Sequence, residues 1–140
     1  MATGVGFATR CLLPAVEVLC VQPEQAPAMT LSLRAGHEVD PGPPNTIADG
    51  VAGRYVLRDV LDDLRAVAAD TFLVSEESIK EGMRLLYRLS GLIVEPAAAL
   101  GIAAILENPE RFRGKTAATI LCGSGIAIAD FERWVVHCDR

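Results

Sequence analysis

Long apolar runs, which would identify a membrane protein, are missing from this sequence of 140 residues. A spanning helix needs roughly 20 apolar residues without a charge. The best candidate, "LIVEPAAALGIAAIL" at residues 92–106, is shorter and is interrupted by Glu95 and Pro96. The first residues do not form a basic region followed by an apolar stretch and a cleavage site, so no signal peptide is predicted. The sequence therefore predicts a soluble, cytoplasmic protein with no membrane partner.

Positive charge and closely spaced cysteines are also scarce. There are 13 Lys and Arg against 18 Asp and Glu, so the net charge is −5. This charge argues against nucleic acid as a partner, because proteins bind nucleic acid mainly through Lys and Arg side chains that neutralise its phosphates. The four cysteines lie far apart and form no CxxC pair: Cys11, Cys20, Cys122 and Cys138. Structural zinc favours close ligand pairs, so reduced thiols in a cytosolic core are the simpler interpretation.

The residues that are present predict one domain, residues 1–140, with an α/β fold. Hydrophobic residues make up 51% of the chain and aromatic residues 5%, so Ala, Val, Leu and Ile must build the core. Three short apolar segments predict strands at 16–23 ("VEVLCVQP"), 71–75 ("TFLVS") and 117–123 ("AATILCG"). Between and after them, helical spacing predicts helices at 26–37, 54–67, 76–90, 96–106 and 128–138. Apolar strands that alternate with helices predict a three-layer parallel sheet flanked by helices.

Particular residues set the ends and faces of these helices. Gly36 is a plausible C-terminal cap, and Ser75 is a good N-terminal cap. Residues 37–50, rich in Pro, Gly, Asn and Asp, predict a loop. The predicted helices at 54–67 and 76–90 each carry apolar residues at helical spacing, which are expected to form their buried faces: Val56, Leu57, Val60, Leu61 and Leu64 in the first, and Ile79, Met83, Leu86 and Leu89 in the second.

Glycine-rich turns mark the candidate ligand sites. In a parallel α/β sheet, ligands bind at the carboxyl ends of strands, and "CGSG" follows the third predicted strand with Cys122 at its start. The alternative is a tight turn with a buried thiol. At the beginning of the chain, the glycines of "MATGVGF", Gly4 among them, could start a helix against an anion. As a dinucleotide motif this stretch is weak, because the third glycine and a preceding strand are missing.

Glu95 is the unusual residue of the apolar stretch. Proline favours the first position of a helix, so Pro96 begins one and Glu95 is its cap residue. A carboxylate there gains from the helix dipole, and a simple cap is one interpretation. The following helix is apolar on all sides and must be buried, where an unpaired carboxylate is costly. The second interpretation is therefore that Glu95 lines a polar pocket near the carboxyl edge of the sheet.

Taken together, four stretches resemble one enzyme family. "PEQAPAMTLSLRAG", "TIADGVAG", "FLVSEESIKEGMRLLYRLSGLIVEPAAALGIAAIL" and "GKTAATILCGSG" occur in the order and at the spacings of the C-terminal part of threonine/serine dehydratases. These are tryptophan-synthase-β-like pyridoxal-phosphate enzymes, and serine racemase is a relative. The resemblance covers essentially the whole chain. It implies part of the large domain of that fold, pyridoxal phosphate as cofactor and a small amino acid as substrate.

The resemblance also implies roles for individual residues. The Cys or Ser at the position of Cys122 hydrogen-bonds the pyridine nitrogen of the cofactor in this family. Glu95, Asp49 and Gly50 are placed beside the same pocket, and Gly4 just follows the glycine run that holds the phosphate. A neutral thiol leaves the pyridine ring uncharged. The ring is then a weaker electron sink, which favours β-elimination.

Other family features are absent from the sequence. Only Lys80 and Lys115 are present, and neither has the Ser-x-Lys motif of the Schiff-base lysine. The consecutive glycines are missing too, so no catalytic residue is assigned. In the racemase branch of the family, two acidic residues bind a divalent metal ion. Gln22 and Ala28 stand at those positions here and cannot act as carboxylate ligands, so no metal is predicted.

Two hypotheses about function therefore stay open. The chain is either part of an ammonia-lyase, cut inside its large domain and completed by an N-terminal segment, or a non-catalytic remnant or interaction partner. In either case we expect an exposed apolar sheet edge and a tendency to associate, including as a homo-oligomer.

Overall fold

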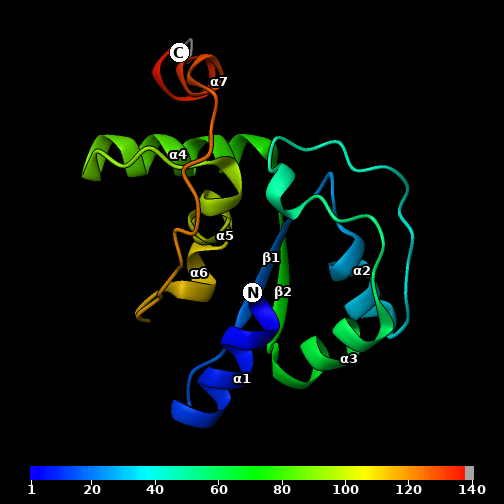
Figure 1. Cartoon of the computed structure of the whole chain (residues 1–140). Coiled ribbons are helices and arrows are strands. Elements are labelled where there is room, and N and C mark those ends of the chain that lie inside the picture. The colour runs from blue at the N-terminus through cyan, green and yellow to red at the C-terminus, as the bar shows by residue number, and fades with distance from the viewer. Residues whose placement is uncertain (138–140) are drawn as a thin grey trace.

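Three layers make up the fold of residues 1–137, which are the residues that the computed structural model describes. Strands β1 (Leu19–Pro23) and β2 (Asp70–Val74) pair in parallel and form the middle layer. Helix α5 (Leu100–Glu107) contacts both strands on one side, and α2 (Ala28–Ala35) contacts both on the other (Figure 1). The predicted α/β class, with a parallel sheet between helices, is confirmed.

The first three helices pack on one another beside the sheet. Helix α1 (Ala2–Leu12) packs against α3 (Arg58–Val67), which also contacts α2. Helix α2 ends at Gly36, whose φ of 79° is left-handed, so the predicted cap is confirmed. Helix α3 starts later than expected. Leu57 precedes its first turn and is 70% exposed, so its prediction as a core residue is wrong, whereas Leu61 and Leu64 are buried as predicted.

Helix α4 (Glu76–Ser90) closely follows the expectation at both ends. The Ser75 hydroxyl accepts a hydrogen bond from the N–H of Ser78, and Gly91 ends the helix with a φ of 67°. Ile79 and Met83 are buried, but Leu89 is 79% exposed, because α4 continues beyond the elements that cover it (Figure 1).

Small residues let the following helix approach α4 closely. Residues 96–106, predicted as one helix, form the 3₁₀ turn η2 (Pro96–Ala99) and then α5, and α6 (Pro109–Phe112) follows. A β-carbon at Gly82 of α4 would lie 3.1 Å from the carbonyl oxygen of Ala99. Ala99 and Ala103 are fully buried. The apolar stretch is therefore the core of the molecule, and its polar exception stands at one end.

The third predicted strand, residues 117–123, is wrong as a strand. The described part of the chain has one sheet with two strands, and residues 113–127 are irregular between α6 and α7 (Ile128–Phe131). A strand requires a neighbour for its backbone hydrogen bonds, and no strand lies beside this segment. The β-type composition of the segment is a property of its side chains and does not supply that neighbour.

The last described residues pack on α4. After α7, residues Glu132–Val136 form a π-helical turn, η3, in place of a regular helix. The Phe131 and Tyr87 rings meet edge to face with centroids 5.1 Å apart. Arg84 Nε donates to the carbonyl of Trp134 at 2.9 Å. Cys138, at the end of the predicted helix, lies outside the described residues.

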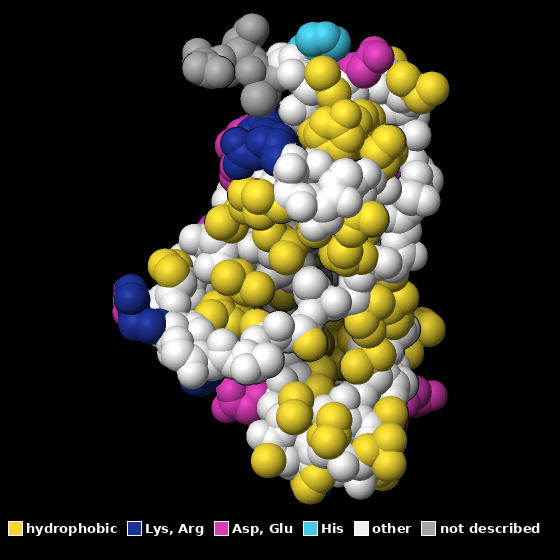
Figure 2. Space-filling view, turned by 90° about the vertical axis from the view of Figure 1, so that its left-hand side faces the viewer, with side chains coloured by type: hydrophobic (Ala, Val, Ile, Leu, Met, Phe, Trp, Pro, Cys, Tyr) yellow, Lys and Arg dark blue, Asp and Glu magenta, His cyan; other side chains and the backbone are white. Residues whose placement is uncertain are grey.

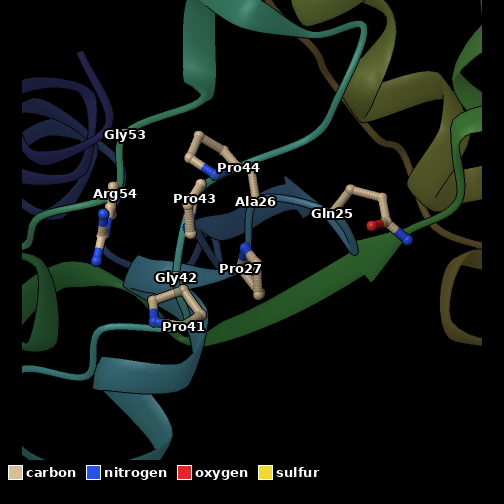
Figure 3. Close-up of a pocket in the computed structure, with 9 residues that line it drawn as sticks. All are labelled: Gln25, Ala26, Pro27, Pro41, Gly42, Pro43, Pro44, Gly53 and Arg54. Carbon is tan, nitrogen blue, oxygen red and sulfur yellow. The ribbon is translucent and has the colours of Figure 1, made fainter.

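The predicted loop is held in place by a charged pair. Both oxygens of Asp40 accept hydrogen bonds from Arg54, at 2.8 Å each. Beneath this pair, Pro41, Pro43 and Pro44 lie around Pro27 at the start of α2 and leave a cavity of about 20 Å³, room for about one water (Figure 3). The cavity is too small for a substrate. None of the helices among residues 1–137 is both long and apolar enough to span a membrane.

Candidate cofactor site

Glu95 joins the start of the buried helix to the glycine turn that follows Cys122. Its backbone N–H donates to the carbonyl oxygen of Gly123 at 3.1 Å. Its carboxylate Oε2 accepts a hydrogen bond from the N–H of Gly125 at 3.2 Å. Two segments that are far apart in the sequence are therefore connected by one residue, through both its main chain and its side chain.

Glycines make this approach possible. A β-carbon at Gly123 would overlap the Glu95 carboxyl group. On another side, a β-carbon at Gly50 would lie 3.5 Å from Glu95 Oε1 and 3.3 Å from the Ala97 methyl group. Glu95 thus lies between the turn at 123–125 and the 3₁₀ turn η1 (Asp49–Val51). Three of the stretches singled out in the sequence, "IADG", "VEP" and "CGSG", meet here.

The geometry bears on the interpretation of Glu95 as a simple helix cap. The side chain makes no hydrogen bond to the amides of its own helix, so it is not a side-chain cap. It is half-buried and turned toward the glycine turn. Glu95 thus contacts the glycine turn that follows Cys122; a polar pocket beside it and a role in cofactor binding stay predictions.

The other predicted site residues differ in their positions. Cys122 directly precedes Gly123 and is an exposed free thiol, so the alternative of a buried thiol is wrong. Asp49 opens η1 and is exposed beside Gly50. Gly4 lies in the first turn of α1, and a β-carbon there would meet no atom within 4 Å. A role of Gly4 in cofactor binding stays a prediction.

A second carboxylate cluster, at the start of α4, was not found from the sequence. Glu107 Oε1 accepts hydrogen bonds from the N–H and the hydroxyl of Ser75, at 2.9 and 2.8 Å. Partial burial raises the pKa of Glu107, but hydrogen bonds from Ser78 and Ser75 outweigh it and hold the pKa below its usual value. Glu107 is the last residue of α5, and only the fold brings it to Ser75. Its role here is to fix the helix start.

Glu76 of the same cluster ties the long loop to α4. Its Oε2 accepts from the N–H of Ile47 at 2.9 Å, while Oε1 is buried without a partner. Glu76 was expected only as a favourable charge in the first helical turn. The loop that it holds leads directly to η1, so this contact positions Gly50 near Glu95.

Gln22 and Ala28, at the positions expected for metal-binding carboxylates in the racemase branch, make structural contacts here. Gln22 Oε1 accepts a hydrogen bond from the N–H of Thr30 at 2.7 Å, in the first turn of α2. Ala28 is buried. Residues 1–137 contain no group of three or more His, Cys, Asp or Glu side chains arranged to hold a metal ion.

Known proteins are similar to this chain in sequence and fold. The family model for pyridoxal-phosphate dependent enzyme matches residues 1–123. The β-hydroxyaspartate dehydratase of Paracoccus denitrificans is 29% identical over 127 residues, which are 90% of this chain and 40% of that protein. Human serine racemase is 29% identical over an alignment that covers all of this chain and 42% of the racemase. The crystal structure of the T.th. threonine deaminase superposes with a TM-score of 0.85 and 35% identity, over 91% of this chain and 46% of that one.

The chain belongs to the family of pyridoxal-phosphate dependent enzymes. Its fold is that of the tryptophan-synthase-β-like members, and pyridoxal phosphate is the cofactor of the family. It spans less than half the length of these relatives.

Proposed function

We propose that this chain is the C-terminal part of a pyridoxal-phosphate-dependent ammonia-lyase that acts on a small hydroxy amino acid such as threonine or serine. The observation that carries the proposal is the position of Glu95, which is hydrogen-bonded to the glycine turn that follows Cys122. Relatives that are named as a hydroxyaspartate dehydratase and a threonine deaminase support the reaction class.

The residues present fit a flat, polar cofactor. Gly50 and Gly123 carry no side chains beside Glu95, and the Glu95 carboxyl group lies where a β-carbon at Gly123 would be. Backbone without β-carbons can also approach a ring closely. Cys122 is exposed at the edge of this glycine turn. When bound, the cofactor supplies the electron sink for elimination. Cys122 would meet its ring nitrogen with an uncharged group, and Glu95 would hold the turn that carries Cys122.

The covalent lysine must come from elsewhere. Lys80 lies on α4 and pairs with Glu77 at 3.3 Å. Lys115 is exposed just after α6. Neither lysine is next in sequence to Glu95 or to Cys122, and covalent catalysis requires an activated nucleophile within reach of the reacting group. In this proposal the part of the family fold that the chain does not span supplies that lysine and the phosphate-binding glycines.

A reconstitution experiment tests the proposal. The chain is co-expressed with the part of the T.th. threonine deaminase that precedes the matched region, and pyridoxal phosphate is added. We expect a change in the cofactor absorbance that marks covalent binding, with retained affinity in Cys122→Ser and at least roughly tenfold weaker binding in Cys122→Ala. Cys11→Ala, another exposed thiol, is the control. Equal binding by all variants would contradict the role of Cys122.

The second candidate is a non-catalytic interaction protein with the same fold. The specific observation in its favour is that Cys122 and Ile120 are both exposed and could form part of a protein-binding surface. It predicts a stable complex in the same experiment without any change in cofactor absorbance.

A further inference from the structure

The glycine turn of residues 123–125 is held by Glu95, which supplies it with a donor at its N–H and an acceptor at its carboxylate. Figure 2 shows the side of the molecule on which α6 and the segment after it lie; hydrophobic side chains surround a hollow in its middle, while Asp and Glu side chains lie toward its margins. A contact that fixes the Glu95 side chain therefore also fixes the turn that follows Cys122.

The turn η1 lies on the other side of the same carboxylate. A β-carbon at Gly50 would lie 3.5 Å from Glu95 Oε1, so the bare backbone of η1 is close to the carboxyl group. η1 also contacts η2, the turn that Glu95 precedes. The carboxylate is thus enclosed between η1 and the glycine turn, and a displaced η1 would give it room to leave the N–H of Gly125.

Residues 46–51, which lead into η1 and form it, are hydrogen-bonded to one another. The Thr46 hydroxyl accepts a hydrogen bond from the N–H of Ala48 at 3.1 Å. The N–H of Val51 donates to the carbonyl of Ala48 at 3.1 Å, and Ala48 is fully buried in the core. Because these residues are tied to one another, a shift at the start of the segment is passed on to Gly50.

A carboxylate of α4 holds the start of this segment. Glu76 Oε2 accepts a hydrogen bond from the N–H of Ile47 at 2.9 Å, whereas Oε1 is buried and has no partner among the described residues. A buried carboxylate oxygen without a partner is costly. A glutamate that served only the helix dipole could do so with its carboxylate in water. The contact with Ile47 explains why Glu76 is turned inward.

We propose that Glu76 is a positioning residue of the cofactor site: its reach from α4 to Ile47 sets η1 against Glu95 and thereby holds the turn of Cys122. This inference rests on the proposed function and names a residue that supports the same site from outside it. The property that counts is reach and not charge. Glutamine has the same length and offers an acceptor oxygen, whereas aspartate keeps the charge and is one methylene shorter.

The NMR spectrum of the isolated chain tests the proposal. The N–H of Gly125 donates to Glu95 Oε2 at 3.2 Å, so its amide resonance reports that contact. Glu95→Ala gives the position of this resonance without the acceptor. We expect Glu76→Asp and Glu76→Ala to move the resonance toward that position and Glu76→Gln to leave it in place. A role confined to the helix dipole predicts the reverse order for Asp and Gln, because Asp serves the dipole and Gln does not.

Glu107→Ala is the matched control. Glu107 accepts two hydrogen bonds at the same helix start, but from Ser75 and not from the loop. Its loss should lower stability and leave the Gly125 resonance in place. If Glu76→Ala does not fold, the Asp and Gln variants decide the outcome. A resonance that stays in place in Glu76→Asp, or that moves as far in Glu76→Gln or Glu107→Ala, would overturn the inference.

Cofactor binding is measured separately, in the complex with the part of the T.th. threonine deaminase that precedes the matched region. We expect Glu76→Asp to bind pyridoxal phosphate at least roughly tenfold more weakly than the parent protein, and Glu76→Gln and Glu107→Ala to retain its affinity. Undiminished binding in Glu76→Asp would contradict the positioning role. Resonances that move as expected, together with no cofactor binding by the parent complex, would refute the proposed function and leave the contact from Glu76 to Glu95 standing.

Discussion

Gly123 lies so close to the carboxyl group of Glu95 that any β-carbon at position 123 would overlap it. The contact is also directional, since the N–H of Glu95 donates to the carbonyl of Gly123 at 3.1 Å. The identity of one residue is thus fixed by the side chain of the other, and the pair can be tested in the isolated chain.

Substitution of Gly123 tests this contact. We expect Gly123→Ala to lower the free energy of unfolding by about 1–3 kcal/mol, as overpacking does, because the Glu95 carboxyl must move. In a Glu95→Ala background the same substitution should cost much less. The measurement is urea unfolding of the four proteins of the cycle. Gly53→Ala is the control, because a β-carbon at Gly53 would meet no atom within 4 Å; an equal loss in both glycine variants would argue against the contact.

Catalysis by the isolated chain is expected to be absent. Lys80 is engaged with Glu77 on α4 and Lys115 is exposed beyond α6, so no lysine is available for covalent binding at the turn of Cys122. We expect no 2-oxobutyrate from threonine and no pyruvate from serine when pure protein is incubated with pyridoxal phosphate. Steady ammonia release that depends on the cofactor would show the expectation to be wrong.

The pH dependence of stability should contain a contribution from Glu107. Its folded-state pKa lies below the ordinary value of 4.5, so the ionised carboxylate stabilises the fold above that value. This contribution is lost as the pH falls through the folded pKa. We expect Glu107→Gln to be less stable at neutral pH and to lose less stability than the parent protein on acidification. Thermal unfolding from pH 7 to pH 3 measures this, with Glu24→Gln at an exposed site as the control.

Two glycines of α1 should respond in opposite ways to alanine. A β-carbon at Gly6 would overlap the Val67 side chain of α3, whereas one at Gly4 would meet nothing within 4 Å. Gly6→Ala should destabilise the protein by about 1–3 kcal/mol, with partial recovery in Gly6→Ala/Val67→Ala. Gly4→Ala should stabilise it by about 0.5–1 kcal/mol, since alanine favours the helix. Equal effects in chemical denaturation would mean that α1 does not pack on α3 as described.

Local sequence signals predicted both strands that pair and both ends of α4, but not α1 or α6. Ser75, Gly36 and Gly91 act on their own neighbours, so their effect can be read from the chain. Leu57 and Leu89 were assigned to buried faces by spacing, but spacing does not tell where the neighbouring element ends, and both are exposed. The segment 117–123 has the composition of a strand, yet pairing depends on a neighbour that no local signal contains.

The site was predictable in part for the same reason. The unusual carboxylate of an apolar stretch, Glu95, was recognised as a residue with a polar task, and it meets the glycine turn that follows Cys122. The contact of Glu107 with Ser75 joins residues from different helices, so only the fold reveals it. Gly4 was associated with the same site by resemblance, and the structure leaves it on α1 without a neighbour at its β position.

The register that pairs Leu19 with Asp70 has a consequence for the order of folding. Parallel strands need a crossover between them, here α2, the proline-rich loop and α3, and closing so long a loop costs chain entropy before any strand contact forms. The buried hydrogen bond between the hydroxyls of Thr30 and Thr71, 2.7 Å long, connects the crossover to β2. We therefore expect the crossover to pack on β2 before β1 pairs, and refolding kinetics to be more sensitive to Thr30→Val than to changes on α7.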